Sequence, residues 1–163
     1  GNRVHGSSIS AGDTRLTGAG RMGIPQIVAP GCYDLVDVIG WQTLAARWEG
    51  YPTHAHNRLI TSVVLAEADC LAVADAHLTQ LATAIGPTAL ILPTGGCGEW
   101  DRPGADLHNP DGLKAFMERL LAACPESIDL HRIEAHINDD AFVDTALGIL
   151  DGWMEAGIVP TPR

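Results

Sequence analysis

Residues 67–96 decide the fold and read EADCLAVADAHLTQLATAIGPTALILPTGG. The first part of this stretch repeats apolar residues three and four positions apart, which predicts an amphipathic helix over 67–85. Gly86-Pro87 ends that helix, and the unbroken apolar run that follows predicts a buried strand over 88–92. A long helix followed by a tight turn and a buried strand is typical of an α/β domain.

The same alternation extends outward in both directions. A β-branched run predicts a strand over 24–29, and another strand is predicted over 128–134. Asn109-Pro110 and Asp139-Asp140 are typical helix starts, so helices are predicted over 110–124 and 140–154. Shorter elements are also predicted, namely helices over 15–22 and 33–39 and a fourth strand over 51–55. Strands joined by long helices favour right-handed crossovers, so we expect an α/β sandwich with a mainly parallel sheet.

Length and composition restrict the classes of function. The 163 residues, of which 46% are hydrophobic, are enough for one α/β domain over 1–163 with a real core. The 20 acidic residues outnumber the 10 basic ones and give a net charge of -10, which disfavours nucleic acid and membrane surfaces as partners. The four cysteines form no Cys-x-x-Cys pair, and no signal peptide or membrane span is recognisable. We therefore expect a cytoplasmic location.

The glycine-rich segments differ in what they predict. Gly18-Ala-Gly-Arg-Met-Gly23 matches G-x-G-x-x-G, but it precedes a predicted strand instead of following one, so it is not expected to bind a dinucleotide. Pro93-Thr-Gly-Gly-Cys-Gly98 follows a strand, where glycines allow a ligand to approach the backbone closely. The charged residues near Cys97 in the sequence are the acids Glu99 and Asp101, which disfavour a reactive thiolate.

Histidines and carboxylates also gather after predicted strands. His54 and His56 are two residues apart, so on a strand they point to the same side. With His136 and Asp139 they would make a metal site of imidazole and carboxylate ligands, typical of a metal-dependent hydrolase or lyase. The structural alternative is that these histidines hydrogen-bond to the backbone at strand ends.

Several motifs together resemble a known family. They are Gly23-Ile-Pro-Gln-Ile-Val-Ala-Pro-Gly31 with Asp34-Leu-Val-Asp37, His56-Asn57, Leu92-Pro93 with Gly96, Asp101-x-Pro-Gly104, and His136-Ile-Asn-Asp139 with Phe142. In this order they resemble the uncharacterised protein family that includes the inhibitory domain of the tomato mosaic virus resistance protein. The resemblance implies two Rossmann-like α/β domains, the first ATP-binding, with this chain covering most of the second. It therefore implies a three-layer sandwich here and an N-terminal partner domain outside this chain.

Strand-end position and resemblance lead to one expected function. We expect this domain and the N-terminal domain to bind a small anionic or nucleotide-like ligand at the carboxyl ends of the strands. No cofactor is assigned to the domain itself; the resemblance implies ATP for the full-length protein only. Backbone amides of the glycines would hold an anion, and the side chains would orient the ligand. The expected ligand-binding residues are Gly31, Asp34, His56, Asn57, Gly95, Gly96, His136 and Asn138.

Whether the domain catalyses any reaction stays open, and a protein-interaction module without catalysis is a further alternative. Apolar surface intended for the missing half would be exposed, so we expect self-association as a homo-oligomer such as a dimer. Asp139 is expected to cap the last helix, whereas the sequence assigns no structural task to His136 or Asn138.

Overall fold

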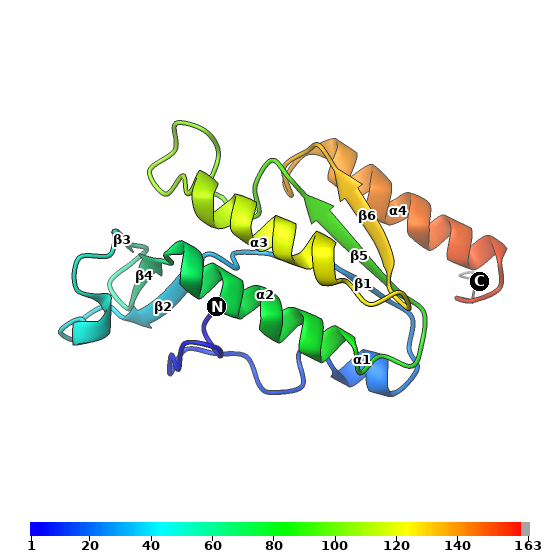
Figure 1. The fold of residues 1–163 in the computed structure, drawn as a ribbon, viewed down its shortest axis with the longest axis horizontal. Helices are drawn as coiled ribbons and strands as arrows, with labels where there is room; N and C mark the ends of the chain where they lie inside the picture. Colours follow the sequence, from blue (N-terminus) through cyan, green and yellow to red (C-terminus); the bar gives the residue numbers. More distant parts are fainter. Residues whose placement is uncertain (161–163) are drawn as a thin grey trace.

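The structure is a computed structural model that describes residues 1–160 (Figure 1). It contains one parallel sheet in the order β1-β5-β6 and one antiparallel sheet in the order β2-β4-β3. The strands are β1 (Gln26–Val28), β2 (Leu35–Ile39), β3 (Thr53–Ala55), β4 (Ile60–Val64), β5 (Thr88–Pro93) and β6 (Asp129–Ile133). The helices are α1 (Gly18–Arg21), η1 (Ala46–Trp48), α2 (Glu67–Leu81), α3 (Pro110–Ala123) and α4 (Asp140–Glu155).

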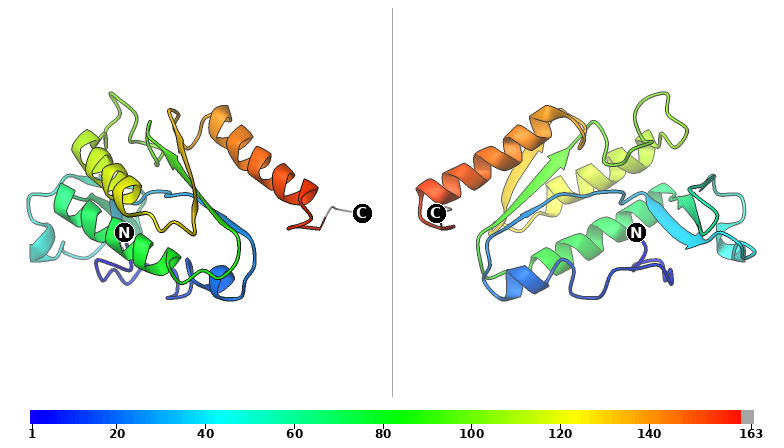
Figure 2. Two further views of the ribbon diagram at one scale, coloured as in Figure 1. Left: turned by 45° about the vertical axis from the view of Figure 1, so that its right-hand side comes forward. Right: turned by 180° about the vertical axis from the view of Figure 1, so that it is seen from behind.

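The parallel sheet is built around β5. Every residue of β5 is buried, because β1 and β6 pair on its two edges and helices cover its faces. Figure 2 shows α2 and α3 on one side of this sheet and α4 on the other. The stack of Tyr33 on Phe116, with ring centroids 3.7 Å apart, ties the segment after β1 to α3. The core therefore lies between the parallel sheet and the pair α2 and α3.

The long predicted elements are confirmed. Helices predicted over 67–85, 110–124 and 140–154 correspond to α2, α3 and α4, and the three main predicted strands correspond to β1, β5 and β6. The Asn109 side chain accepts a hydrogen bond from the Gly112 N–H at 3.1 Å, as expected of an N-cap. The glycines of 18–23 lie in and after α1, ahead of β1, which is the order that a dinucleotide fingerprint does not have.

The N-terminal third differs from the expectations in one helix and in the pairing of one strand. Residues 33–39 do not form a helix, because Leu35–Ile39 pairs with Ile60–Val64 as the strand β2. The alternation of apolar side chains over only five residues suits a strand better than a helix. The strand β4 was not expected, and the predicted strand at 51–55 exists as β3 but pairs with β4 in the antiparallel sheet. The expected parallel sheet is therefore present with three strands, and a separate antiparallel sheet accompanies it.

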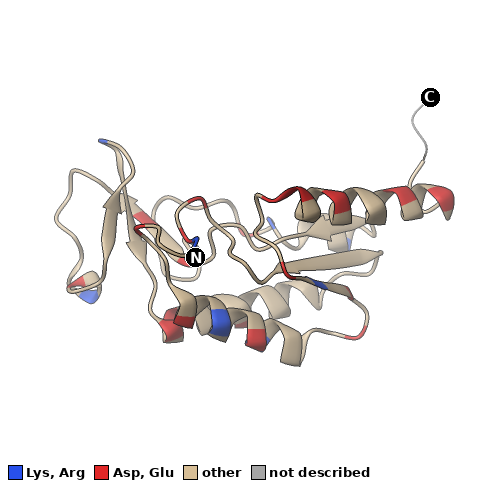
Figure 3. Ribbon diagram, turned by 90° about the horizontal axis from the view of Figure 1, so that it is seen from above, with Lys and Arg blue, Asp and Glu red and all other residues tan. Residues whose placement is uncertain are grey.

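Helix α4 differs from α2 and α3 because it has no buried residue. Val143 and Leu147 are 49% and 51% exposed. Acidic residues also line this helix, which carries no basic residue (Figure 3). Within residues 1–160, no helix combines the length and the apolar character needed to cross a membrane.

Candidate functional site

The loops after β1, β5 and β6 meet at the carboxyl edge of the parallel sheet. The Cys32 N–H donates to the Cys97 carbonyl at 2.9 Å, which joins the loop after β1 to the loop after β5. The Ile137 N–H donates to the Gly96 carbonyl at 3.0 Å, and the Gly95 N–H donates to the Ala135 carbonyl at 2.9 Å. These bonds hold all three loops together where parallel α/β sheets bind ligands.

Asp101 and His136 form a buried cluster that fixes two of these loops. One Asp101 oxygen lies 2.8 Å from His136 Nε2, and the other accepts the N–H groups of Cys97 at 2.5 Å and Gly98 at 2.9 Å. His136 Nδ1 accepts the Asn138 N–H at 3.0 Å, so the ring proton must be on Nε2, facing Asp101. Because both ring nitrogens and both carboxylate oxygens have partners, this Asp101–His136 cluster is a scaffold.

Gly96 completes the cluster because no other residue fits there. Its φ is +128°, and an added Cβ would lie 2.6 Å from Asp101 Oδ1 and 2.6 Å from His136 Cδ2. The glycine thus permits the close approach of the backbone to the cluster. By contrast, a Cβ on Gly31 would meet nothing within 4 Å.

Asp34 is the exception among the polar groups at this edge. Its side chain is buried, with the residue 2% exposed, yet Oδ1 has no hydrogen-bond partner among the described residues. Burial raises the pKa of this carboxyl to about 6, and the nearby Asp101 acts in the same direction. An acid at a helix start would serve as a cap, but Asp34 precedes the strand β2. The structure therefore removes the simplest structural explanation for Asp34.

A cavity of about 660 Å³ lies against the backbone of this segment. Cys32, Tyr33 and Leu35 line it, so its wall includes both chain neighbours of Asp34, while Asp34 itself does not line the cavity. The opposite walls come from α2 and from the loop that carries Trp100, together with the N-terminal segment. Asp37, also in the wall, has both carboxylate oxygens occupied by Asn2 and Ser62.

The other predicted ligand-binding residues are spread over different surroundings. His54 and His56 both contact Trp100, with ring centroids 4.9 and 5.4 Å apart, as expected of residues on one side of a strand. Of the two, His56 lines the cavity. Asn57 shapes a turn, because its side chain accepts the N–H groups of Leu59 and Ile60.

The remaining predicted residues have structural tasks near the Asp101–His136 cluster. The Asn138 side chain donates to Glu99 Oε2 at 3.0 Å on the surface. Asp139 stands at the N-cap position of α4 but makes no side-chain bond to the helix. Instead, its carboxylate accepts the His136 N–H at 2.8 Å and pairs with Arg102 at 2.8 Å. The Arg102 side-chain bond is the main reason that the pKa of Asp139 lies below its usual range.

The geometry does not gather a metal site. Within residues 1–160, no three His, Cys, Asp or Glu side chains lie close enough together to hold a metal ion. His54 and His56 face Trp100, whereas His136 is turned to Asp101 and Asp139 to Arg102. The four residues proposed as metal ligands are thus divided among three different side-chain partners.

The sequence pattern did not predict that Asp101 would be the central acceptor of the Asp101–His136 cluster. This acid stands four residues after Cys97, in the Asp101-x-Pro-Gly104 motif, and a short acid after a glycine-rich turn is suited to accept the free amides of that turn. The expectation that Cys97 is unreactive agrees with the structure, since burial raises the pKa of its thiol.

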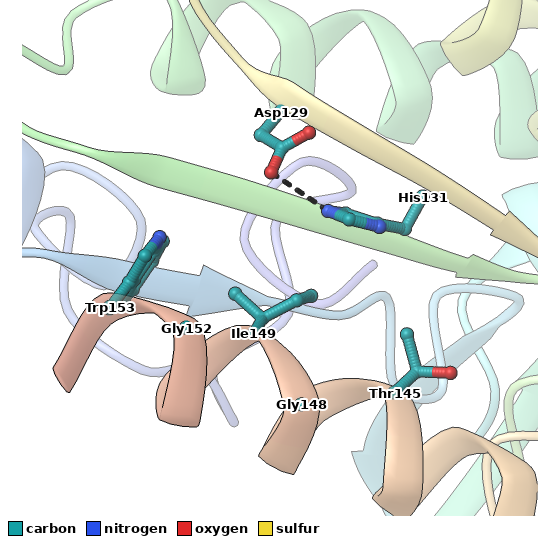
Figure 4. A pocket seen from close by; sticks show the side chains of 7 residues that line it. All are labelled: Asp129, His131, Thr145, Gly148, Ile149, Gly152 and Trp153. Atoms are coloured by element: carbon teal, nitrogen blue, oxygen red, sulfur yellow. Dashed lines mark ion pairs between the residues drawn. The ribbon is translucent and has the colours of Figure 1, made fainter. Parts of the chain in front are cut away.

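A second cavity of about 410 Å³ lies between β6 and α4 (Figure 4). Gly148 and Gly152 contribute no side chains to its helical wall, while Asp129 and His131 face it from β6. The His131 and Asp129 side chains lie 2.9 Å apart at their closest. This hollow is on the α4 side of the sheet, away from the Asp101–His136 cluster.

Comparison with known proteins places the chain in a family. The profile described as "Uncharacterised protein family (UPF0261) C-terminal domain" matches residues 1–154. A UPF0261 protein of Brucella melitensis biotype 1 is 43% identical over 158 residues, which cover 97% of this chain and 38% of the relative. A UPF0261 protein of Clostridium tetani is 27% identical over 155 residues, covering 94% of this chain and 38% of the relative. The chain thus spans well under half the length of these relatives, and it belongs to the UPF0261 family as a C-terminal domain.

Proposed function

We propose that this domain binds a small, nucleotide-like ligand at the carboxyl edge of its parallel sheet, with Asp34 accepting hydrogen bonds from ligand hydroxyl or amino groups. The observation that carries the proposal is the buried Asp34 Oδ1, which has no partner in the described part of the chain. Buried polar atoms are nearly always paired, so an unpaired carboxylate oxygen on a residue whose two chain neighbours line a cavity is a candidate for ligand recognition.

The chemistry of the edge favours a ligand with hydrogen-bond donors over a simple anion. Asp34 and Asp101 are both acidic, and the net charge of -10 opposes anion binding in general. Of the three glycine amides expected to hold an anion, that of Gly95 already donates to Ala135. Ribose hydroxyls and base amino groups supply the donors that a carboxylate accepts.

The proposal extends to the complete protein. We propose that the parallel sheet belongs to a Rossmann-like three-layer sandwich and that an N-terminal domain supplies further contacts to the ligand, with ATP as the first nucleotide to test. Cytoplasmic location and homo-oligomeric assembly remain part of this proposal.

The test measures binding in the complete natural protein. Adenosine, AMP, ATP and ribose are screened by thermal shift and then by isothermal titration calorimetry, in the wild type and in Asp34→Asn. We expect at least one nucleotide-like compound to bind, and Asp34→Asn to weaken it about tenfold or more, because an acceptor of charge-assisted hydrogen bonds is lost. Asp106→Asn, on an exposed acid in the loop after β5, is the matched control. Equal affinity in wild type and Asp34→Asn would refute the proposed role of Asp34.

Helix α4 favours a second candidate function, a protein-interaction module. Its lack of buried residues and its half-exposed Val143 and Leu147 leave an apolar face that could receive another protein, as the resemblance to a virus-inhibiting domain suggested. Sedimentation of the complete protein, compared with Leu147→Asp, tests this candidate. An assembly state that is the same in both proteins would count against it.

A further inference from the structure

We infer that His77 and Gln80 of α2 recognise a planar ligand group whose edge presents hydrogen-bond donors and acceptors side by side, such as a nucleobase or a primary amide. Both residues line the 660 Å³ cavity whose wall also includes Tyr33 and Leu35, the chain neighbours of Asp34. The inference rests on the proposed function only in assuming that Asp34 and the pair His77 and Gln80 bind the same ligand. The planar group itself is recognised by His77 and Gln80 and not by Asp34.

The hydrogen bonding of His77 fixes which of its nitrogens is free. Nδ1 lies 2.7 Å from the Val73 carbonyl oxygen, one turn earlier in α2. A carbonyl only accepts hydrogen bonds, so Nδ1 carries the proton, and in the neutral ring Nε2 is left as an acceptor. Within residues 1–160, Nε2 has no hydrogen-bond partner. Burial lowers the pKa of His77, which keeps the ring neutral at pH 7.

The ring of His77 is also held in orientation. It meets Phe116 of α3 edge to face, with centroids 5.7 Å apart and planes at 90°. Phe116 is itself fully buried and stacked on Tyr33, which precedes Asp34 in the chain. A histidine fixed by its own helix on one side and by the core on another presents Nε2 with little loss of freedom on binding.

Gln80 supplies the complementary group. It lies three residues after His77, on the same face of α2, and within residues 1–160 its side-chain amide makes no hydrogen bond. The amide offers one acceptor and a donor group, beside the single acceptor of His77. Together the pair matches an edge with alternating donors and acceptors, which nucleobases and primary amides have.

The charges around the cavity narrow the ligand class. Arg15 lines the same cavity and forms no ion pair within residues 1–160, which disfavours a cationic ligand. The lone pair on Nε2 would repel a carboxylate or phosphate placed directly against it. The group that faces His77 is therefore neutral, whereas any anionic part of the ligand would be favoured near Arg15.

The experiment separates this pair from Asp34. Adenosine, cytidine, nicotinamide and ribose are titrated calorimetrically at pH 7.5 into the complete natural protein and into His77→Phe and Gln80→Met. Phenylalanine preserves the aromatic contact with Phe116 while removing Nε2, and methionine preserves the length of Gln80 without its amide. Thr79→Ala, on an exposed residue of α2 outside the cavity, is the matched control. Circular dichroism and melting curves verify that each variant folds.

We expect both substitutions to weaken the nucleosides and nicotinamide about tenfold or more, with ribose binding unchanged and the control equal to wild type. In ¹⁵N spectra of the wild type, the unprotonated His77 Nε2 signal is expected to shift when adenosine is added. If nucleosides bind but His77→Phe and Gln80→Met leave their affinity unchanged, the inference is overturned while the proposed function stands. If the affinity for nicotinamide depends on His77 while the affinity for no compound depends on Asp34, the proposed function fails and the inference stands. If none of the four compounds binds, the inference is overturned, and the proposed function fails as well if AMP and ATP do not bind.

Discussion

The loop after β5 and the loop after β1 end neighbouring strands of one sheet, yet they use their acids in opposite ways. In the loop after β5, Asp101 is surrounded by donors from Cys97, Gly98 and His136. In the loop after β1, Asp34 is also buried, but its Oδ1 has no partner within residues 1–160. The hydrogen bonds of Asp101 hold two loops in place, whereas Oδ1 of Asp34 is left to accept a hydrogen bond from a ligand.

This difference teaches that position at the carboxyl edge does not by itself identify a functional residue. His136 lies at that edge and is 2% exposed, but all of its polar atoms are occupied by the protein. Hydrogen-bond accounting separates the residues that build the edge from those left to act there. On this ground Asp34 is the functional candidate, and the Asp101–His136 cluster keeps the edge rigid around it.

The largest expected effect distinguishes the glycines of the two loops. Gly96→Ala places a Cβ against Asp101 and His136 at a left-handed φ, so we expect a loss of about 3 to 5 kcal/mol in the free energy of unfolding. Gly31→Ala, the matched change after β1, meets open space and should remain within about 0.5 kcal/mol of wild type. Urea denaturation measures both. Equal losses at the two positions would remove the contrast between the loops.

Removing the fully paired acid comes next. Asp101→Ala leaves the N–H groups of Cys97 and Gly98 and the Nε2–H of His136 without their acceptor. We expect a loss of about 3 to 4 kcal/mol, because buried donors without partners are costly. Asp106→Ala, on an exposed acid of the same loop, should change stability by less than about 0.5 kcal/mol. A mild effect of Asp101→Ala in thermal and urea melts would contradict the scaffold role.

Replacing the unpaired acid Asp34 should raise the free energy of unfolding at neutral pH, whereas replacing Asp101 should lower it. Burial raises the pKa of Asp34 to about 6 from its ordinary 3.8, so the folded chain holds this proton more tightly than the unfolded chain does. The resulting contribution to stability is complete below pH 3.8 and is lost as the pH rises through about 6. At 1.36 kcal/mol per pKa unit, the loss amounts to about 3 kcal/mol.

Asp34→Asn removes this pH dependence, so we expect the variant to be more stable than wild type at pH 8 by up to about 3 kcal/mol. The difference should shrink to near zero at pH 3.5. Urea melts of both proteins at several pH values provide the comparison. A variant less stable than wild type at pH 8 would show that the protein supplies a partner to Asp34 after all.

The smallest expected effect concerns His136. His136→Ala leaves one Asp101 oxygen and the Asn138 N–H without partners, and we expect a loss of about 2 kcal/mol. Since no ring nitrogen is free, ligand affinity in the folded variant should stay close to wild type. Melting curves and calorimetric titration with adenosine measure the two quantities. Unchanged stability together with lost binding would instead return His136 to the ligand site.

Much of the fold was predictable because it depends on local patterns. Helices α2, α3 and α4 follow from apolar spacing and from Asn109-Pro110 and Asp139-Asp140 at their starts. The strand β2 was not predictable in the same way. Its five residues alternate too briefly to identify their pairing, and only β4, more than twenty positions away, makes them a strand.

The same distinction between local sequence patterns and tertiary contacts applies to the candidate site. The sequence by itself determined that glycines and acids follow β1, β5 and β6, and hence which edge of the sheet is polar. Only the tertiary structure decided which acid is paired, because the partners of Asp101 come from a helix-preceding loop 35 residues away as well as from its own turn. It also brought His77 and Gln80 to the cavity that Tyr33 and Leu35 line. Hydrogen bonds and burial depend on distances between segments that are far apart in the chain, and no local pattern of residues contains those distances.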